Sequence, residues 1–577
     1  MSKTKKPRAT RDSAEDAPTQ VIETKTTAYD GIRENLEAIV VAFILALVIR
    51  HFAVEAFEIP TGSMAPTLYG IHAWIECPNC EDFEFNAGLS SDTESGKSLW
   101  APVDYGVYRG SCPKCQEHQV RTFDANRLPA TAFGVECSSG DCNATWQGNP
   151  GDLTVEKLLV KGRMGGPPVM RFQCPNCEYR FRDVVQKGSR TGGHKILVNK
   201  MRYKVGDPQR WDVIVFQFSE KRNYIKRLLG LPGETVYIQG GDLCVKKPGE
   251  DEFRVQGKTE RPDVRDALWF KINDSDIVER GLNPVPAWDE LHKKGSALTP
   301  DASKWWTWKE GSWTVNVPNT GIAILEYNRE CQSTYNYNSL TPDSRRSTRY
   351  EVGDKKVEFT VHPTKENSAG SAWIGGEIRD GEFTYQFRVP IGEPGSGDKA
   401  TLFRLPNQVR SAYPDPGRQP QRDMAAERVV ADVALPSLRS SHVAFWNADD
   451  RVAVEIDGEE VLAIDYVSGS PEIRHRSEHY VQILASNIMA DFQSIQVYRD
   501  IYYTYPGMGS YAGPKSPLRV PSEEIDGHNG YFPCGDNSPS SSDGRFWGTA
   551  PEKNMMGRAF FIFWPAWPTN FQCGLIR

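Results

Sequence analysis

Residues 211–234 read WDVIVFQFSEKRNYIKRLLGLPGE, and this stretch decides the fold class of the chain. Residues 211–218 and 224–229 are rich in the β-branched and aromatic side chains that favour strands. Pro232-Gly233 marks a turn after the second run. Shorter runs of the same kind at 196–198, 235–238 and 243–245 extend the pattern. Residues 195–246 therefore predict a dense β segment in a mainly β protein.

Lys226 lies inside the second of these predicted strands. The two-residue period of a strand puts Tyr224, Lys226 and Leu228 on one face. If that face is half-buried, desolvation lowers the pKa of the lysine, which is the condition for a general base near neutral pH. The alternative is a lysine on an edge strand that points toward water.

Ser63 lies in a stretch built to expose a hydroxyl group. Residues 57–68 read FEIPTGSMAPTL, in which Pro60 and Pro66 stiffen both sides and Gly62 permits a turn. An exposed Oγ on rigid flanks is what a nucleophile needs. The alternative is an ordinary serine in a turn. A third stretch, GDNSPSSSDGRFWG at 535–548, reads by itself as a polar loop with an Asp–Arg pair.

These stretches together resemble the signature boxes of type I signal peptidases, in the family's order. The serine box, Ser/Thr-Gly-Ser-Met-x-Pro-Thr-Leu, matches residues 61–68, and the lysine box, Tyr-Ile-Lys-Arg-(apolar)₂-Gly-x-Pro-Gly-Asp/Glu, matches 224–234. The last box matches 535–548, and RWDVIVF at 210–216 resembles the family's Arg-Gly-Asp strand. Trp211 and Gly544 depart from the pattern, where the family has glycine and serine. The resemblance covers residues 36–69, 194–246 and 530–566.

The resemblance implies a serine endopeptidase that needs no cofactor for catalysis. It makes Ser63 the nucleophile and Lys226 the general base, oriented by Ser541, and it places Thr61 and the Ser63 N–H in the oxyanion hole. It makes Phe57, Ile59 and Pro60 the walls of small apolar pockets for Ala-x-Ala sequences. The residues that it implies as supporting ones are Asp536, Asp543, Arg545 and Tyr224. The partners that it implies are secreted or membrane preproteins carrying signal peptides.

The N-terminal region predicts a membrane anchor. Residues 38–49 form an uninterrupted apolar run, which follows a polar tail with several basic residues. Basic residues beside a membrane span favour the cytoplasmic side, so we expect this tail to remain in the cytoplasm. Arg50 can snorkel toward the far interface and so extend the span. A buried core helix and a cleaved signal peptide are the alternatives, although the residues after the run make a poor cleavage site. We expect a single-pass protein of the bacterial cytoplasmic membrane with its catalytic domain on the extracytoplasmic side.

Eight cysteines in residues 70–193 form four close pairs, and three of the pairs have the sequence Cys-Pro-x-Cys. The cysteines are Cys77, Cys80, Cys112, Cys115, Cys137, Cys142, Cys174 and Cys177. Such knuckles suit tetrahedral thiolate coordination and favour two structural Cys₄ zinc sites in a zinc-ribbon-like insertion. Disulfides are the alternative, because the expected compartment is oxidising. We expect consecutive knuckles to pair, with nested pairing as the other arrangement.

A second insertion, residues 250–505, has strand signals at short spacing and many aromatic residues. Residues 452–456 and 461–464 flank Asp457-Gly458 and predict a hairpin. Residues 442–461 resemble hairpins of concanavalin-like jelly-roll sandwiches, which suggests a lectin-like β-sandwich. The aromatic richness favours a sandwich core over a sugar-stacking surface, and it leaves carbohydrate open as a partner.

The expected organisation has seven parts. A disordered cytoplasmic tail at 1–35 and an anchor at 36–54 precede a catalytic core in three pieces, 55–69, 194–249 and 506–577, with insertions at 70–193 and 250–505. The net charge of −7 argues against a nucleic-acid partner. Two other functions stay open: a self-cleaving Ser/Lys repressor protease, although no DNA-binding domain precedes the site, and a non-enzymatic anchored scaffold that binds zinc and sugar.

Overall fold

The computed structural model describes residues 28–577 except 90–99, 139–141, 162–168, 220–221, 259–260, 283–285, 291–304, 310, 318–320, 334–336, 338–349, 366–371, 381–382, 394–397, 407–426, 467–479, 508 and 565–572. Most of the tail expected at 1–35 therefore lies outside the described residues. The described part is mainly β, as the sequence predicts.

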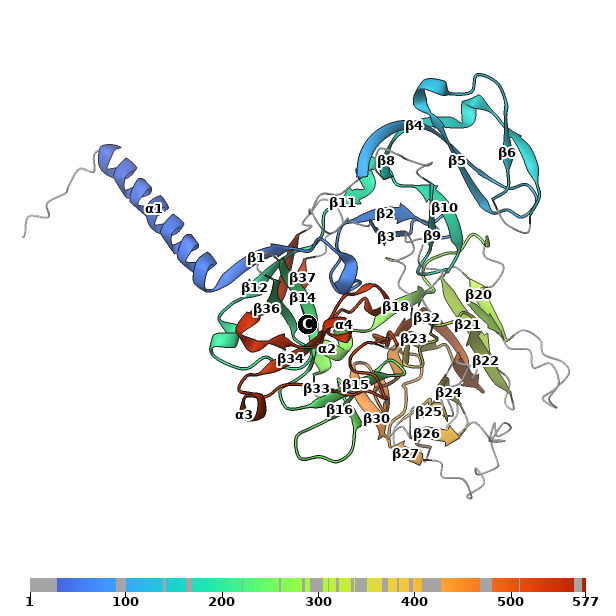
Figure 1. The fold of residues 1–577 in the computed structure, drawn as a ribbon. Helices are drawn as coiled ribbons and strands as arrows, with labels where there is room; N and C mark the ends of the chain where they lie inside the picture. Colours follow the sequence, from blue (N-terminus) through green and yellow to red (C-terminus); the bar gives the residue numbers. More distant parts are fainter. Residues whose placement is uncertain are drawn as a thin grey trace, which may run out of the picture. The chain divides into compact units, whose positions relative to one another are not determined.

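Three distant pieces of the chain form one antiparallel sheet. Its strands, in spatial order, are β1 (Val54–Glu58), β12 (Lys195–Asn199), β36 (Met555–Trp564), β13 (Val213–Ser219), β14 (Arg222–Gly230), β34 (Gly530–Cys534) and β35 (Ala550–Pro551), with β37 (Gly574–Leu575) beside β36. In Figure 1, green and red strands lie side by side in this sheet, although green marks the middle of the sequence and red its C-terminal part. We refer to this sheet as the core sheet.

The core sheet is buried on both faces. Val213 and Val215 pack in one hydrophobic cluster, and Ile214 and Phe216 pack in another on the opposite side. This alternation follows from the two-residue period of a strand. The pairing register sets Ile214 opposite Lys226. The lysine therefore emerges within an apolar face.

A smaller sheet continues directly from β14. Its order is β17 (Arg254–Val255), β16 (Asp242–Lys246), β15 (Thr235–Gln239) and β33 (Leu518–Arg519). Before β13, Trp211 has a φ of 72°, in the left-handed region that favours glycine and is unusual for a bulky residue. The departure from the family's glycine thus falls at a position where glycine has a conformational advantage.

The cysteine-rich insertion is a set of small sheets rather than one compact layer. They are β11 (Arg190–Thr191), β2 (His72–Glu76) and β3 (Glu84–Gly88); β9 (Val169–Gln173) and β10 (Arg180–Val184); β5 (His118–Asp124), β4 (Trp100–Ser111) and β8 (Leu153–Lys161); and β6 (Phe133–Glu136) with β7 (Thr145–Gly148). Cysteine knuckles join several of these hairpins.

The second insertion folds as a two-sheet sandwich. One sheet has the order β20 (Trp306–Lys309), β21 (Ser312–Asn316), β32 (Met489–Arg499), β23 (Lys355–Pro363), β28 (Ser441–Ala448), β29 (Arg451–Ile456) and β30 (Glu459–Asp465), with β18 (Phe270–Asp274) beside β32. The other has the order β19 (Trp288–Glu290), β22 (Ile322–Tyr327), β31 (Val481–Ser486), β24 (Trp373–Asp380), β25 (Phe383–Pro390), β26 (Ala400–Pro406) and β27 (Glu427–Ala431). Phe387 and Phe445, one from each sheet, meet at 4.8 Å between ring centroids in the shared core. The predicted hairpin at 452–464 is confirmed as β29 and β30.

Residues 1–54 form a unit separate from residues 55–577. Helix α1 (Ala28–Phe52) begins eight residues before the expected anchor. Across the part of the chain that the structure describes, no helix combines the length and the hydropathy that crossing a bilayer requires. The anchor expected at 36–54 is therefore not confirmed.

Candidate active site

Ser63 and Lys226 meet although 163 residues separate them. Ser63 lies in a single 3₁₀ turn, Gly62–Met64, and the Lys226 Nζ is 2.8 Å from the Ser63 Oγ. Only 4% of Lys226 is exposed, and its Nζ also contacts the Ile225 carbonyl at 2.9 Å. The sequence-predicted nucleophile and base are thus within hydrogen-bonding distance of each other.

Burial sets the protonation of the lysine. Desolvation lowers the pKa of Lys226 to about 8, although the neighbouring Asp543 carboxylate opposes this shift. The face of the Tyr224 ring lies 5.3 Å from the Nζ, and Tyr224 stacks in turn on Phe218. About a tenth of the amine is therefore neutral at pH 7, compared with far less for an ordinary lysine, and a neutral amine can accept the proton of a hydroxyl group.

The last predicted box fixes the serine turn from one side. The Asn537 backbone N–H donates to the Ser63 carbonyl at 3.0 Å, and its side-chain amide donates to the Gly62 carbonyl at 2.7 Å. Thr67 donates its hydroxyl to Asp536 at 2.6 Å. Sequence reasoning missed Asn537 and Thr67 because each is a common polar residue of a loop, without a spacing that indicates a role.

Two buried ion pairs stand around the lysine. Asp543 and Arg545 pair through both carboxylate oxygens, and Asp543 also accepts from the Gly535 N–H at 2.8 Å. Although burial opposes its charge, the Arg545 guanidinium holds the pKa of Asp543 below its ordinary value. Asp536 pairs in the same two-point manner with Arg227. Each carboxylate near Lys226 is thus already neutralised by an arginine.

Ser541 lies close to the turn but makes no hydrogen bond to the lysine. It is 6% exposed, and its Oγ has no hydrogen-bond partner among the described residues. A Cβ added at Gly535 would lie 2.2 Å from this Oγ and 2.4 Å from the Ser63 carbonyl oxygen. Ser541 is therefore near Ser63, and its expected role in orienting Lys226 stays a prediction.

The remaining predicted residues occupy different environments. Thr61 precedes the turn with an extended backbone, and its side chain forms no capping hydrogen bond. Phe57 is half-buried, Ile59 is 2% exposed in the core, and Pro60 is exposed. The oxyanion-hole role of Thr61 and the pocket-lining roles of these three residues stay predictions.

The eight knuckle cysteines gather in two clusters with nested pairing. Cys77 and Cys80 meet Cys174 and Cys177, while Cys112 and Cys115 meet Cys137 and Cys142. The expectation that the first two knuckles pair with each other is therefore wrong. The first knuckle lies between the paired strands β2 and β3, the last lies between β9 and β10, and these two knuckles close one site.

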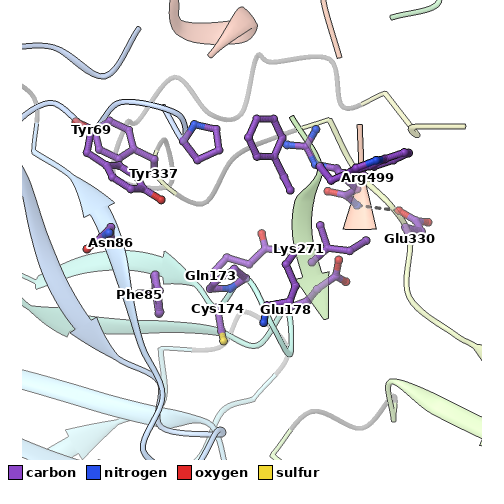
Figure 2. A pocket seen from close by; sticks show the side chains of 16 residues that line it. Tyr69, Phe85, Asn86, Gln173, Cys174, Glu178, Lys271, Glu330, Tyr337 and Arg499 are labelled. Carbon is purple, nitrogen blue, oxygen red and sulfur yellow. Dashed lines mark hydrogen bonds between the residues drawn. The ribbon is translucent and has the colours of Figure 1, made fainter. Parts of the chain in front are cut away.

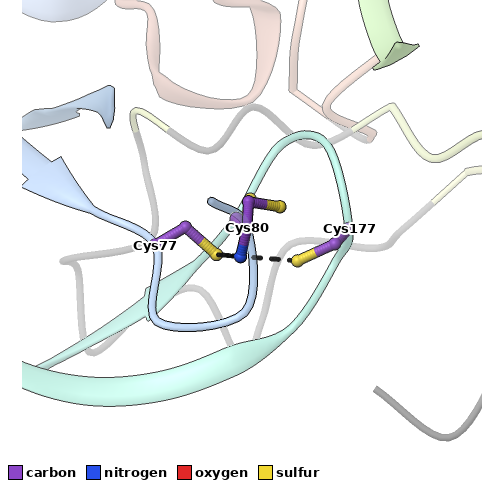
Figure 3. Close-up of side chains that lie close together, drawn as sticks. Cys77, Cys80 and Cys177 are labelled. Atoms are coloured by element: carbon purple, nitrogen blue, oxygen red, sulfur yellow. Dashed lines mark hydrogen bonds between the residues drawn. The ribbon is translucent and has the colours of Figure 1, made fainter. Parts of the chain in front are cut away.

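The distances between the cysteine sulfurs distinguish a zinc site from disulfide bonds. None of these eight cysteines forms a disulfide in the structure, and Cys77 Sγ lies 3.6 Å from Cys177 Sγ and Cys80 Sγ 3.8 Å from Cys174 Sγ. Figure 3 shows Cys77, Cys80 and Cys177 converging from their two loops. Four Zn–S bonds of about 2.3 Å in a tetrahedron place the sulfurs about 3.8 Å apart. The cluster therefore has the donor set and the spacing of a Cys₄ zinc site.

The first cluster also contacts the sandwich. Asn79 and Asn176, one in each of its knuckles, are almost fully buried. Asn79 Oδ1 accepts from the Leu282 N–H at 2.7 Å, and Asn176 Oδ1 accepts from the Asp274 N–H at 2.7 Å. The two insertions are therefore joined through the loops that hold the cysteines. We call Asn79 and Asn176 the knuckle asparagines.

A cavity of about 330 Å³ lies among the serine box, the cysteine insertion and the sandwich. Figure 2 shows Tyr69 and Tyr337 at one end of it, and Glu330 and Arg499 at the other. Gln173 and Glu178 come from the loop that carries Cys174. All three parts of the chain therefore contribute to one partly open pocket beside the serine turn.

Comparison with known proteins relates the core to one family. The family model described as "Signal peptidase, peptidase S26" matches residues 187–329 and 515–564. These residues include Lys226 and Ser541 but not Ser63, so the position of the serine beside the lysine depends on the tertiary structure.

Curated relatives carry the same description. Signal peptidase I of Bacillus caldolyticus is 38% identical over 60 residues, covering 10% of this chain and 33% of that protein. Signal peptidase I of Pseudomonas aeruginosa is 40% identical over 81 residues, covering 10% of this chain and 28% of that protein. Signal peptidase I V of Bacillus subtilis is 31% identical over 80 residues, covering 13% of this chain and 48% of that protein. The chain thus spans less than half of the length of each of these relatives.

One of the similar solved structures is the carbohydrate binding module CBM66 from Bacillus subtilis, which is 11% identical in sequence and has a TM-score of 0.21. The match covers 37% of this chain and 95% of the module. At so low a TM-score the match carries no argument about fold or ligand. The family match and the curated relatives do agree with each other and with the predicted resemblance, and they concern the core that holds Lys226. Residues 187–329 and 515–564 of this chain, which include Lys226, are therefore similar to the signal peptidase family, peptidase S26.

Proposed function

We propose that this chain is a membrane-bound serine endopeptidase that removes N-terminal signal peptides from exported preproteins, cleaving after Ala-x-Ala. The observation that carries the proposal is the 2.8 Å separation of Lys226 Nζ and Ser63 Oγ in a buried, apolar setting. Burial favours the neutral amine, and the contact lets that amine take the hydroxyl proton directly.

In this mechanism, Lys226 accepts the Ser63 proton as the Oγ attacks the scissile carbonyl carbon. The resulting ammonium then donates the proton to the amine of the leaving mature protein, and an ester to Ser63 remains. Lys226, neutral again, takes a proton from water as the water oxygen attacks the ester carbon. It returns that proton to the Ser63 Oγ as the carbon–Oγ bond breaks and the signal peptide leaves with a free carboxylate. The Ser63 N–H and the Thr61 hydroxyl are proposed to stabilise the oxyanion; the loss of one such donor typically costs roughly 100- to 1,000-fold in rate.

The signal peptide is proposed to dock in an extended conformation beside the serine turn. Strand β1 lies at one end of the order of the core sheet and runs toward Thr61. An edge strand offers unpaired backbone groups, which an extended peptide can use for main-chain hydrogen bonds. Phe57 and Pro60, which remain partly accessible, are proposed to contact the small residues before the cleaved bond.

We further propose that residues 36–54 attach the chain to a bilayer. The support is the exposure of large apolar side chains along α1, such as Ile39 at 65%, Val41 at 64% and Phe43 at 63%. Exposed apolar surface of this extent marks an interaction site. Release from membranes by detergent, but not by alkaline carbonate, tests the attachment. The cytoplasmic membrane and the extracytoplasmic position of the core belong to the same proposal.

Each Cys₄ cluster is proposed to hold one structural zinc ion. The Sγ–Sγ separations of 3.6 to 3.8 Å support this, and four thiolates leave no coordination position open for chemistry. No cofactor takes part in the proposed peptide cleavage. Carbohydrate binding by the sandwich stays a prediction from the aromatic content of the sequence.

The decisive experiment incubates the full chain, in detergent, with a preprotein that carries an Ala-x-Ala site. Mass analysis of the product should place the cut after the second alanine, and Ser63→Ala and Lys226→Ala should each abolish it. Lys195→Ala is the matched control, because Lys195 lies in the same sheet but packs on Trp564, 5.6 Å from its ring centroid. Cleavage by Ser63→Ala at the wild-type rate would exclude the proposed dyad.

A further inference from the structure

Tyr337, a residue of the sandwich insertion, packs directly on the serine turn. It is 8% exposed, and a Cβ added at Gly62 would lie 1.9 Å from its Cε1 atom. The three atoms nearest to that Cβ all belong to Tyr337. The ring therefore occupies the space next to the residue that precedes the nucleophile.

The ring is held from its other sides as well. A Cβ at Gly88 would lie 2.4 Å from its Cε1, and the Tyr69 ring is 5.6 Å away between centroids. Its hydroxyl donates to the Ile71 carbonyl at 3.1 Å. Figure 2 shows Tyr69 and Tyr337 next to each other at the end of the cavity. The Tyr337 ring is thus packed between the turn and strand β3.

Asn537 and Tyr337 both contact the turn. Asn537 bonds the Gly62 and Ser63 carbonyls, and Tyr337 packs against the Gly62 Cα where no side chain intervenes. The hydrogen bonds from Asn537 hold two carbonyl oxygens, whereas Tyr337 fills the space beside the Gly62 Cα. A bulky, buried ring restricts movement of the turn because a close-packed interior yields little.

We propose that Tyr337 is a positioning residue, which acts through Gly62 to keep the Ser63 Oγ within reach of the Lys226 Nζ. It does not touch the reacting atoms. The proposal rests on the proposed function, and it means that the sandwich insertion supplies part of the support of the active site. Removal of the ring leaves a void beside Gly62, into which the turn can shift.

The first test measures kcat and KM for preprotein cleavage by the full chain. Because misplacement of a reacting group by about 1 Å can cost roughly 100-fold, Tyr337→Ala should lower kcat by about 10- to 100-fold. KM should change little, because the proposed substrate contacts lie elsewhere. Tyr337→Phe, which keeps the ring and loses only the bond to Ile71, should retain most of the activity. Tyr350→Ala removes a tyrosine of the same insertion, 37% exposed and stacked on Tyr502, and should leave kcat unchanged.

The second test is a double-mutant cycle. Gly62→Ala places a methyl group against the ring and should inactivate the enzyme, although Gly62 is not among the residues with a positive φ. Gly62→Ala/Tyr337→Ala gives that methyl group room, so it should cleave faster than Gly62→Ala alone. If Tyr337→Ala loses its fold by circular dichroism, Tyr337→Leu takes its place in the same cycle.

The outcomes separate this proposal from the proposed function. Cleavage by Ser63→Ala would overturn both. If Ser63→Ala is inactive, wild-type kcat in Tyr337→Ala overturns the positioning role alone, and so does equal impairment of Tyr337→Phe and Tyr337→Ala. If the double variant cleaves no faster than Gly62→Ala, the positioning role is also overturned, because the proposal requires that Tyr337 act on Ser63 through its contact with Gly62.

Discussion

Arg227 and Asp536 form a two-point ion pair that is fully excluded from solvent, with Nε–Oδ1 at 2.9 Å and Nη2–Oδ2 at 2.7 Å. Each residue is adjacent in sequence to a residue of the candidate site, since Lys226 precedes Arg227 and Asn537 follows Asp536. The pair therefore ties the strand that carries the lysine to the loop that holds the serine turn.

Removal of one partner of this pair should destabilise the protein strongly. Asp536→Ala leaves the Arg227 charge buried without its partner, and such changes cost about 3–5 kcal/mol. Urea unfolding should show this as a lower midpoint with an unchanged slope. Asp526→Ala breaks the exposed pair with Arg519 and should leave the midpoint in place. Equal midpoints for the wild type and Asp536→Ala would contradict the buried character of the pair.

The activity should rise with pH through about 8. Lys226 has its pKa lowered to about 8 by burial. Below that pH the site holds an ammonium, which cannot accept the serine proton, so kcat/KM should fall by about tenfold for each pH unit. Above it the neutral amine predominates and the rate should level off. A profile of kcat/KM from pH 6 to pH 10 checks this, and a rate that falls as the pH rises from 6 to 8 would contradict a neutral base.

Gly535→Ala should abolish activity although it removes no catalytic group. The new Cβ would lie 2.4 Å from the Ser63 carbonyl oxygen, a backbone atom that cannot move without shifting the turn. We expect a loss of at least about 100-fold in kcat. Gly151→Ala is the matched control, because its Cβ would meet nothing within 4 Å. Normal cleavage by Gly535→Ala would show that the turn tolerates displacement.

Disruption of the two Cys₄ clusters should have unequal effects. Cys177→Ser alters the buried cluster that joins the sandwich, whereas Cys115→Ser alters the cluster that contains an exposed cysteine. Each variant should lose one of two bound zinc ions by metal analysis, but Cys177→Ser should lower the melting temperature more. Equal melting temperatures would indicate that the first cluster does not stabilise the contact with the sandwich.

The knuckle asparagines should matter for stability independently of the metal. Asn79→Ala leaves the Leu282 N–H, and Asn176→Ala the Asp274 N–H, without its acceptor. Each loss should cost about 1–3 kcal/mol in the free energy of unfolding. Zinc content should stay at the wild-type value in Asn79→Ala, whereas Asn176 Nδ2 also donates to Cys80 Sγ at 3.8 Å, so metal analysis of Asn176→Ala shows whether that bond supports the cluster. A combined loss of metal would instead mean that these residues support the cluster itself.

The sequence alone predicted the candidate nucleophile and base of the core. The strand period around Lys226, the proline-flanked turn at Ser63 and the polar last box each depend on residues close together in the chain. Short-range patterns of this kind report local backbone preferences and burial, so they predicted the β segment, the hairpin in the sandwich and the family resemblance. Cysteine spacing likewise predicted thiolate clusters, because a knuckle is a local structure.

Only the tertiary structure decided which of these local pieces meet. The meeting of the first and last knuckles, the bonds from Asn537 to the serine turn and the contact of Tyr337 with Gly62 join residues separated by about a hundred positions or more. No spacing rule covers such pairs, because their proximity results from the packing of entire sheets against one another. The lowered pKa of Lys226 has the same origin, since the desolvation that lowers it comes from side chains that the fold brings around the amine.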